Sequence, residues 1–174
     1  MSQLIFKFPF KATYFENDFY VSSNNFSAYK LIESCPNWPD KWINIFGPKG
    51  CGKTHLVNIL KKKIDSFYKK ASDFNNSDLI KIEKYQCIII DNYENNINDN
   101  LLYSLLNHSK QLNKYIVINS LKPLHLFSTN LKDLESRLNS FLKVSIDYPT
   151  DDLLRVIISK SFSDKQINLN NKNL

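Results

Sequence analysis

The sequence predicts an α/β protein with a phosphate-binding loop, in which a parallel sheet lies between layers of helices. A complete G-x-x-x-x-G-K-[ST] pattern occupies residues 47–54, and all 3 glycines of the chain lie inside it. Around this loop, apolar runs of strand length alternate with segments of helical periodicity. A chain of 174 residues is long enough for one such domain and too short for two.

Composition favours a folded cytoplasmic protein. The hydrophobic content is 43%, and no apolar run approaches the ~20 residues of a membrane span. The N-terminus lacks the pattern of a secretory signal, so we expect no membrane association. The three cysteines form neither a metal-ligand pattern nor a disulfide framework, and Cys51 and Cys87 are interpreted as packing residues.

The positive charge does not by itself predict a nucleic-acid-binding protein. The formal net charge is +6, but the chain is also rich in Asn and Ile, a bias that AT-rich coding DNA would produce. The lysine run at residues 61–63 predicts a solvated helix face more readily than a DNA footprint. We therefore expect any contact with DNA to be indirect.

The first half of the chain gives the following expected elements. An apolar N-terminal segment precedes a helix at residues 26–32, which ends before Pro36 and Pro39, and a short strand then covers residues 42–46. From Lys53 a helix is predicted by apolar residues at helical intervals, namely Leu56, Leu60, Ile64 and Phe67. The polar stretch 72–80 is expected to be a loop.

The second half continues the alternation. Residues 87–90 and 115–118 are fully apolar runs typical of buried parallel strands, and residues 101–112 between them predict a helix. A leucine-rich stretch at 124–138 precedes an edge strand at 141–146. Thr150 is expected to cap a last helix over residues 151–162, and a polar tail follows from residue 163.

Three polar features come at the carboxyl ends of predicted strands: the glycine loop, Asp91 and Asn119. Ligands of parallel α/β sheets bind beyond that edge. The sequence thus places these features at one site.

The glycine loop predicts a nucleotide site. Its glycines let consecutive backbone N–H groups point at phosphate oxygens, and the helix that follows adds a partial positive charge. Lys53 is expected to reach the β- and γ-phosphates, and Thr54 to place its hydroxyl on Mg²⁺. We expect ADP or ATP to be bound by nine consecutive residues, Gly47, Pro48, Lys49, Gly50, Cys51, Gly52, Lys53, Thr54 and His55.

Asp91 ends an apolar strand in the manner of a Walker B motif, so its carboxylate is expected to hold Mg²⁺ together with Thr54. The alternative is an aspartate that caps the next turn. Asn92 stands where an ATPase of this class carries the carboxylate that prepares the attacking water, and an amide cannot act as a base. Weak intrinsic hydrolysis is expected unless Glu94 substitutes.

Asn119 and Arg137 are candidate catalytic residues. Asn119 can position water near the γ-phosphate, or it can simply cap its strand. Arg137 can pair locally with Asp133 or Glu135, but a lysine would serve equally well there. Arg137 and Arg155 are the only arginines among 23 basic residues, which favours a role for Arg137 that requires a guanidinium, such as an arginine finger.

Four short segments resemble, in order, motifs of the DnaA-type AAA+ family: residues 52–56, 90–94, 119–123 and 134–138. The closest likeness within that family is to the Hda regulators. Residues 18–21 and 36–39 resemble the alphaproteobacterial form of these regulators. The likeness covers about residues 3–170.

The resemblance implies roles for individual residues. Asp91 would be the Walker B residue, Asn119 sensor 1, and Arg137 an arginine finger presented to a neighbouring subunit. Some Hda-like members also carry Asn at the position of Asn92. The N-terminal motif at residues 3–6 resembles the sliding-clamp-binding motif of these regulators, and its contacts would be made by Gln3, Leu4 and Phe6.

The resemblance also implies a domain plan and a function. Residues 1–12 would be a clamp-binding tail, 13–150 the AAA+ core, and 151–174 the start of a helical lid that is absent or truncated. The implied function is regulation of replication initiation, in which the chain acts with the sliding clamp to promote hydrolysis of ATP bound to DnaA. Assembly into a homo-oligomer is a further possibility.

Two other functions stay open. The chain could be a DnaA-like initiator or helicase-loader ATPase that binds DNA, although nothing after residue 150 predicts a helix-turn-helix. A small P-loop kinase normally surrounds its phosphates with several arginines, and 2 are too few.

Overall fold

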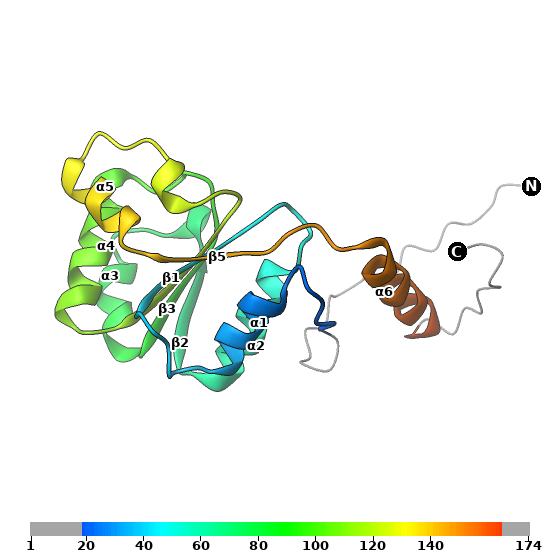
Figure 1. Ribbon diagram of the computed structural model, residues 1–174. Coiled ribbons are helices and arrows are strands. Elements are labelled where there is room, and N and C mark those ends of the chain that lie inside the picture. Colours follow the sequence, from blue (N-terminus) through cyan, green and yellow to red (C-terminus); the bar gives the residue numbers. More distant parts are fainter. Residues whose placement is uncertain (1–18, 165–174) are drawn as a thin grey trace, which may run out of the picture.

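A five-stranded parallel sheet forms the centre of the computed structural model, which describes residues 19–164 (Figure 1). The strands lie in the order β2-β3-β4-β1-β5, and every neighbouring pair is parallel. Their bounds are Trp42–Phe46 for β1, Ser66–Lys70 for β2, Cys87–Tyr93 for β3, Tyr115–Ser120 for β4 and Leu142–Ser145 for β5. The predicted fold class is confirmed.

Helices cover both faces of the sheet (Figure 1). On one face lie α1 (Phe26–Glu33) and α2 (Lys53–Lys63), which contribute residues such as Ile32 and Leu60 to one apolar core. On the other face lie α4 (Asp99–Gln111) and α5 (Lys132–Asn139), which contribute residues such as Leu105 and Leu134 to a second core. The remaining turns of helix are the 3₁₀ segments Ala71–Asp73, Ile82–Lys84 and Leu124–Leu126 and the one-turn helix α3 (Asp78–Lys81).

The central strands explain why their sequences are continuously apolar. Side chains of a strand alternate between the two faces of a sheet. Ile88 and Ile90 of β3 therefore pack into the core under α4, whereas Ile89 packs into the core under α2. All three side chains are inaccessible to solvent, so this strand could not carry a polar residue before Asp91 without burying it.

The helix predicted from Lys53 ends earlier than expected, and a strand was missed. Ile64 adopts an extended conformation after α2, and residues 66–70 then pair with β3 as an edge strand. Phe67 packs on one face of the sheet and Tyr68 on the other, which is the alternation of a strand. The helical spacing of Ile64 and Phe67 was a coincidence, because a short strand leaves few positions from which to tell the two periods apart.

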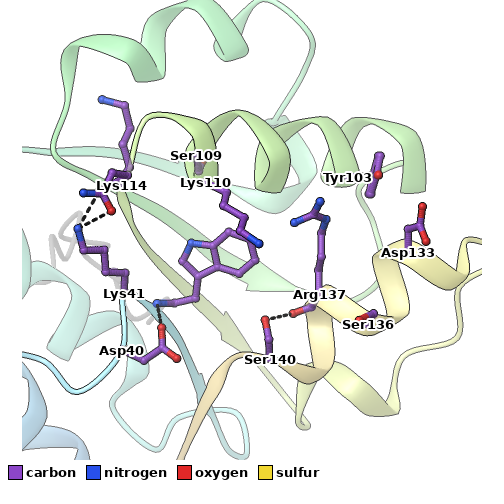
Figure 2. Close-up of a pocket in the computed structure, with 12 residues that line it drawn as sticks. Asp40, Lys41, Tyr103, Ser109, Lys110, Lys114, Asp133, Ser136, Arg137 and Ser140 are labelled. Carbon is purple, nitrogen blue, oxygen red and sulfur yellow. Dashed lines mark hydrogen bonds between the residues drawn. The ribbon is translucent and has the colours of Figure 1, made fainter.

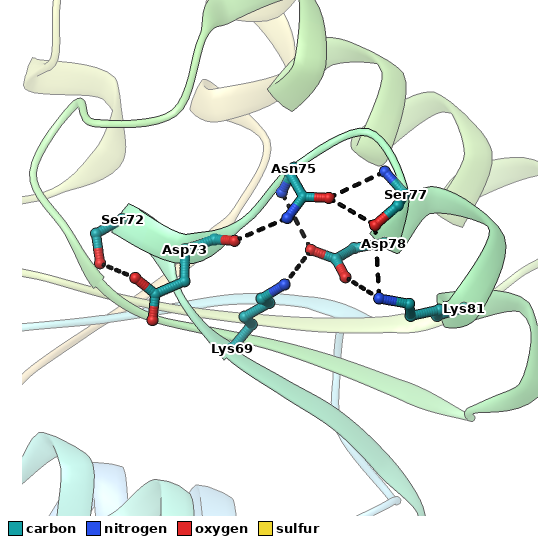
Figure 3. Close-up of polar contacts among 7 residues, drawn as sticks. All are labelled: Lys69, Ser72, Asp73, Asn75, Ser77, Asp78 and Lys81. Atoms are coloured by element: carbon teal, nitrogen blue, oxygen red, sulfur yellow. Dashed lines mark hydrogen bonds and ion pairs between the residues drawn. The ribbon is translucent and has the colours of Figure 1, made fainter.

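The polar stretch 72–80, expected to be a loop, contains the end of a 3₁₀ segment and the start of α3. Asp78 organises it: its carboxylate accepts hydrogen bonds from Lys69 Nζ at 2.6 Å, Lys81 Nζ at 3.1 Å and the backbone N–H of Asn75 at 3.1 Å (Figure 3). Burial raises the pKa of Asp78, but the hydrogen bonds from these partners outweigh it and hold the pKa below its ordinary value. A buried carboxylate with two lysine partners that reach the surface therefore fixes this segment.

The last helix, α6 (Asp151–Asp164), lies beyond the end of the sheet (Figure 1). Its predicted cap is confirmed, since the backbone N–H of Leu153 donates to Thr150 Oγ1 at 3.3 Å. None of the helices within residues 19–164 is long and apolar enough to cross a membrane.

Candidate functional site

A cavity of about 730 Å³ lies at the carboxyl edge of the sheet, between the glycine loop, the ends of β3 and β4, and the segment after β2. It is lined by residues of the predicted loop, including Lys53, Thr54 and His55, and by Asn92 and Glu94 from the far side. Of the three polar features that the sequence placed at this edge, the glycine loop lines the cavity, whereas Asp91 and Asn119 are buried and do not line it.

The loop needs glycine at two positions for different reasons. A Cβ atom on Gly47 would lie 2.1 Å from the carbonyl oxygen of Ile146, so no side chain fits there. Gly52, which precedes α2, has a φ of 103°, a conformation that residues with a side chain rarely adopt. These two positions fix the path of the loop into the helix.

Lys53 is folded back onto the loop that precedes it. Its Nζ donates to the carbonyl oxygens of Gly47 and Pro48, both at 2.7 Å, and lies 3.7 Å from Cys51 Sγ. Only 7% of Lys53 is exposed, yet the residue lines the cavity. The ammonium group is thus positioned beside the cavity as the positive charge that a bound anion would need. Rotation of the side chain would move this group from the loop carbonyls to a phosphate in the cavity.

Asp91 does not itself line the cavity, but its carboxylate joins the elements that form the site. Its Oδ2 accepts hydrogen bonds from Thr54 Oγ1 and Tyr68 Oη, both at 3.0 Å. Its Oδ1 accepts from Asn119 Nδ2 at 2.9 Å and from the backbone N–H of Asn92 at 3.1 Å. One carboxylate therefore links α2, β2, β4 and the end of β3.

All four donors to Asp91 are neutral. The carboxylate is 1% exposed, and no lysine or arginine forms an ion pair with it in the part of the chain that the structure describes. A buried carboxylate without a countercharge is costly, and hydrogen bonds offset only part of that cost. A cation bound at this site would therefore offset the charge of the carboxylate.

The oxygen donors present fit Mg²⁺. This ion prefers carboxylate and hydroxyl oxygens, and it keeps several water and phosphate ligands, so few protein ligands suffice. Thr54 and Asp91 supply one hydroxyl and one carboxylate within hydrogen-bond distance of each other. No group of three His, Cys, Asp or Glu that could hold a metal occurs within residues 19–164, so a site at Asp91 would depend on a ligand that brings its own oxygens.

Asn92 and Glu94, which follow Asp91 in the chain, differ in their surroundings. Asn92 has a φ of 57°, is exposed and lines the cavity. Glu94 also lines the cavity, and its Oε1 lies 3.7 Å from Lys49 Nζ. Glu94 therefore lies within ion-pair distance of a lysine of the loop, and both side chains are exposed.

Two contributors to this edge were missed from the sequence. Tyr68 lies on the unrecognised strand β2, so its contact with Asp91 had no signal without the fold. Asn44, in the middle of the apolar run of β1, is fully buried and donates from Nδ2 to Ile118 O at 2.9 Å and to Ser120 Oγ at 2.8 Å. A lone asparagine inside an apolar strand could have indicated, from the sequence alone, a buried side chain that hydrogen-bonds to a neighbouring strand.

Arg137 lies far from the glycine loop. It is on α5 and lines a different cavity, at the amino ends of β1 and β4 (Figure 2). Its guanidinium lies 5.2 Å from the centre of the Tyr103 ring. Neither Asp133 nor Glu135 forms an ion pair with it in the described range, so the local pairing considered from the sequence is not observed. The remaining arginine, Arg155, lies on α6.

The cysteines and the N-terminal motif complete the placement of the predicted residues. Cys51 and Cys87 are buried, and burial raises the pKa of the Cys87 thiol far above its ordinary value, so this side chain packs as an apolar group. Gln3, Leu4 and Phe6 lie outside the described residues, as does the predicted boundary between residues 12 and 13.

Comparison with known proteins finds similarity to the replication initiator DnaA in both sequence and structure. No protein-family model matches the chain. The chromosomal replication initiator protein DnaA of Spiroplasma citri is 26% identical over 167 residues, a match that covers 78% of this chain and 36% of that protein. The chain thus spans about a third of the length of this curated relative.

Solved structures agree on the fold. AMPPCP-bound DnaA from Aquifex aeolicus has a TM-score of 0.69 and 21% identity, over 91% of this chain and 57% of that one. Domain III of the Thermotoga maritima replication initiation protein DnaA has a TM-score of 0.74 and 21% identity, over 95% of this chain and 80% of that one. The chain therefore has the fold of a DnaA domain III, and its sequence is similar to that of a DnaA protein over most of its length.

Proposed function

We propose that the cavity at the carboxyl edge of the sheet binds an adenine nucleotide with Mg²⁺. The observation that carries this proposal is the buried Asp91 carboxylate, which has four neutral donors and no lysine or arginine partner among the described residues. It accepts one of these hydrogen bonds from the Thr54 hydroxyl at 3.0 Å. Lys53 would turn from the loop carbonyls to the β- and γ-phosphates, and Thr54 and Asp91 would hold the metal. A relative of the same fold was solved with AMPPCP, an ATP analogue, which supports the same ligand class.

Titration with fluorescent ADP and ATP tests this proposal. Lys53→Ala should weaken binding by about 100-fold, because it removes a charge-assisted contact to the phosphates. Lys143→Ala, an exposed lysine on β5, is the matched control and should bind as the parent chain does. Unchanged affinity in Lys53→Ala would contradict the assignment.

Intrinsic hydrolysis should be weak, because Asn92 offers an amide where a base is needed and the nearby Glu94 carboxylate is paired with Lys49. We expect turnover well below the roughly 1 per second typical of the slower enzymes. Asn92→Asp should raise the rate, and Glu94→Gln should change it little. Turnover of ordinary size that disappears in Glu94→Gln would identify Glu94 as the base.

At the level of the cell, the proposed function is regulation of replication initiation in the manner of the Hda regulators. The chain would act with the sliding clamp to promote hydrolysis of ATP bound to DnaA. Three features support this: the similarity to DnaA, the residue Asn92 in the chain's own site, and an arginine that lies at the opposite edge of the sheet from that site. Arg137 would act on a partner's nucleotide, and Asn119 would position water in the chain's own site.

Reconstitution with DnaA, DNA-loaded clamp and ATP tests the regulatory proposal. Arg137→Ala should fold and bind nucleotide and clamp, yet fail to accelerate hydrolysis by DnaA, since an arginine finger is worth roughly 10³–10⁵ in rate. The double variant Gln3→Ala and Phe6→Ala should lose clamp binding with little change in the thermal midpoint. Full stimulation by Arg137→Ala would contradict the finger, and clamp binding by the double variant would contradict the N-terminal motif.

A second candidate is an initiator or helicase-loader module that binds DNA directly. It is favoured by the similarity to an initiator protein and by a DnaA of similar fold that was solved bound to AMPPCP and single-stranded DNA. A competition assay between duplex or single-stranded DNA and the clamp separates the two. Binding to DNA alone at physiological salt, with no affinity for the clamp, would favour this second candidate.

A further inference from the structure

The helix α6 exposes most of its apolar side chains. Five of them lie within six consecutive positions and together form what we call the apolar face of α6: Leu153, Leu154, Val156, Ile157 and Ile158. At ~3.6 residues per turn, they cover about half of the helix circumference. Leu153 is 9% exposed, but the other four are 40–44% exposed. A helix with an apolar arc this wide normally packs against other elements, and within residues 19–164 this face is left largely uncovered.

Further exposed apolar side chains lie in the segments that adjoin α6. Tyr148, in the connection to α6, is 72% exposed. Val21, which follows a residue in contact with α6, is 42% exposed. Single exposed apolar residues are normal, but a group of them on one part of a protein usually marks a contact site. This end of the molecule therefore has the character of an interaction surface.

The first described residues of the chain lie against α6. Lys160 Nζ lies 5.6 Å from the centre of the Tyr20 ring. Lys160 follows Leu153 by two turns of helix, so both lie on the same side of α6. Asn24 Nδ2 also donates to the carbonyl oxygen of Tyr148, at 2.8 Å, just before α6 begins. The chain that precedes residue 19 therefore enters the molecule beside the apolar face of α6.

Residues 4–10 have the composition and the spacing to cover this face. They contain two aliphatic residues and three alternate phenylalanines, namely Leu4, Ile5, Phe6, Phe8 and Phe10. An extended segment with this spacing presents its three rings on one side. The segment 165–174, which follows α6, consists mainly of Asn, Lys and Gln and offers far less apolar surface.

The connection between the two parts is long enough. Eight residues, 11–18, separate residues 4–10 from residue 19, and an extended chain of this length reaches roughly 30 Å. The 14 residues of α6 span only about 21 Å. A short tether also gives an effective concentration in the millimolar range, so that even a weak contact is populated.

We propose that residues 4–10 dock on the apolar face of α6 of the same chain, where Phe6, Phe8 and Phe10 cover its exposed side chains. Docking engages Leu4 and Phe6, which are also the residues assigned to the sliding clamp. The clamp would therefore compete with α6 for this segment. The competition rests on the proposed function, whereas the docking does not.

Pairing of α6 with a second copy of the chain is the competing explanation. A stable interface between two proteins buries about 800 Å² on each partner. Four partly exposed side chains supply much less than this, whereas a tethered segment needs no such area. The two explanations differ in whether the contact forms within one chain.

An engineered disulfide tests the docking in the full chain. In a Cys35→Ser background, which removes the partly exposed thiol, Phe8→Cys is combined with Ile158→Cys on the apolar face. The control combines Phe8→Cys with Ser159→Cys, an exposed position opposite the centre of that face. Oxidised glutathione starts the reaction, and non-reducing electrophoresis and mass spectrometry measure the product. The first pair should form an intramolecular disulfide at least about tenfold faster than the control pair, because docking raises the local concentration on one side of the helix only.

A charge on the apolar face should weaken the docking. Leu154→Asp, added to the first pair, should slow the cross-link about tenfold, because docking would remove a carboxylate from water. Leu154 is exposed and lies in the first turn of α6, where an acidic residue suits the helix, and circular dichroism checks the fold. Leu126→Asp, at another exposed leucine, is the matched control and should leave the rate unchanged.

Three results would overturn the proposal. The first is equal rates for the two cysteine pairs, and the second is a rate that Leu154→Asp leaves unchanged. The third is a product that consists mainly of covalent dimers, which would assign the apolar face to a second copy of the chain.

A last arm separates the docking from the proposed function. The disulfide-locked chain should not bind the sliding clamp, and reduction with dithiothreitol should restore binding. Clamp binding by the locked chain at full affinity would contradict the competition. If the reduced chain does not bind the clamp while the cross-link stays specific for Ile158→Cys, the clamp role fails and the docking stands.

Discussion

Asp78 and Asp91 are both almost inaccessible carboxylates, yet their surroundings differ in one respect. Asp78 receives hydrogen bonds from two lysines and a backbone N–H, whereas Asp91 receives four from neutral groups. Asp78 is therefore a completed structural cluster (Figure 3). Both oxygens of Asp91 have hydrogen-bond donors, but the negative charge of the carboxylate is not balanced by a cationic side chain. A buried carboxylate of this kind is suited to bind a cation.

The largest expected effect comes from breaking the completed cluster. Asp78→Asn should lower the free energy of unfolding by about 3 kcal/mol, because it removes the charge that Lys69 and Lys81 compensate inside the segment after β2. Urea denaturation at pH 7 measures this change. Because the nucleotide cavity does not include Asp78, nucleotide affinity should survive. A loss below about 0.5 kcal/mol would mean that the cluster contributes no more than surface ion pairs do.

The same cluster predicts a pH dependence. The pKa of Asp78 is depressed in the folded protein, so its contribution to stability is present above the unfolded pKa of roughly 3.9 and is lost as the pH falls through the lower folded value. The stability difference between the parent chain and Asp78→Asn should therefore be complete at pH 7 and shrink below about pH 4. A difference that grows on acidification would contradict the sign of this shift.

Tyr68→Phe tests a smaller contribution, at the neutral donors of Asp91. Removing the Tyr68 hydroxyl deletes one hydrogen bond to the carboxylate and should lower stability by about 1 kcal/mol in the absence of ligands. Mg²⁺–nucleotide should bind at least as tightly, because Oδ2 loses a competitor for the metal. Weaker nucleotide binding in Tyr68→Phe would show that the hydroxyl serves the bound state.

The smallest effect on stability is expected for Asp91→Asn without ligands, less than about 1 kcal/mol. An amide at this position can keep its contacts, since Asn119 Nδ2 and the Asn92 N–H can donate to its oxygen, while the Thr54 and Tyr68 hydroxyls can turn to accept from its NH₂ group. The change also removes an uncompensated buried charge. A loss as large as that of Asp78→Asn, measured by urea denaturation, would erase the distinction between the two carboxylates.

The sequence predicted the features that repeat along the chain or depend on a local pattern. Buried parallel strands such as β3, the glycine loop and the Thr150 cap all have local signatures, and each lies where it was expected. The strand β2 was not predicted, because it has no such local signature. Its five residues at the sheet edge mix apolar and charged side chains, and they continue a helical spacing by chance.

Features that depend on contacts between distant residues could not be predicted. The sequence singled out Asp91 at the end of its strand, but it gave no sign that Asp78 is also buried or that only Asp78 has cationic partners. The partners of each carboxylate are brought in by other elements, such as Tyr68 from β2 and Asn119 from β4. The isolation of Arg137 from acidic neighbours is likewise a property of the fold, since Asp133 and Glu135 are adjacent to it in sequence. The residues of the site were therefore predictable, and their charge balance was not.

The central claim is that Asp91 helps to bind a metal ion and that Asp78 does not. The Mg²⁺ dependence of ADP affinity tests this claim most directly. Isothermal titration of ADP with and without Mg²⁺ should show tightening of at least about tenfold in the parent chain, as expected for a charge-assisted contact. Asp78→Asn should keep this tightening, and Asp91→Asn should lose it while folding normally. Full Mg²⁺-dependent tightening in Asp91→Asn would contradict the account.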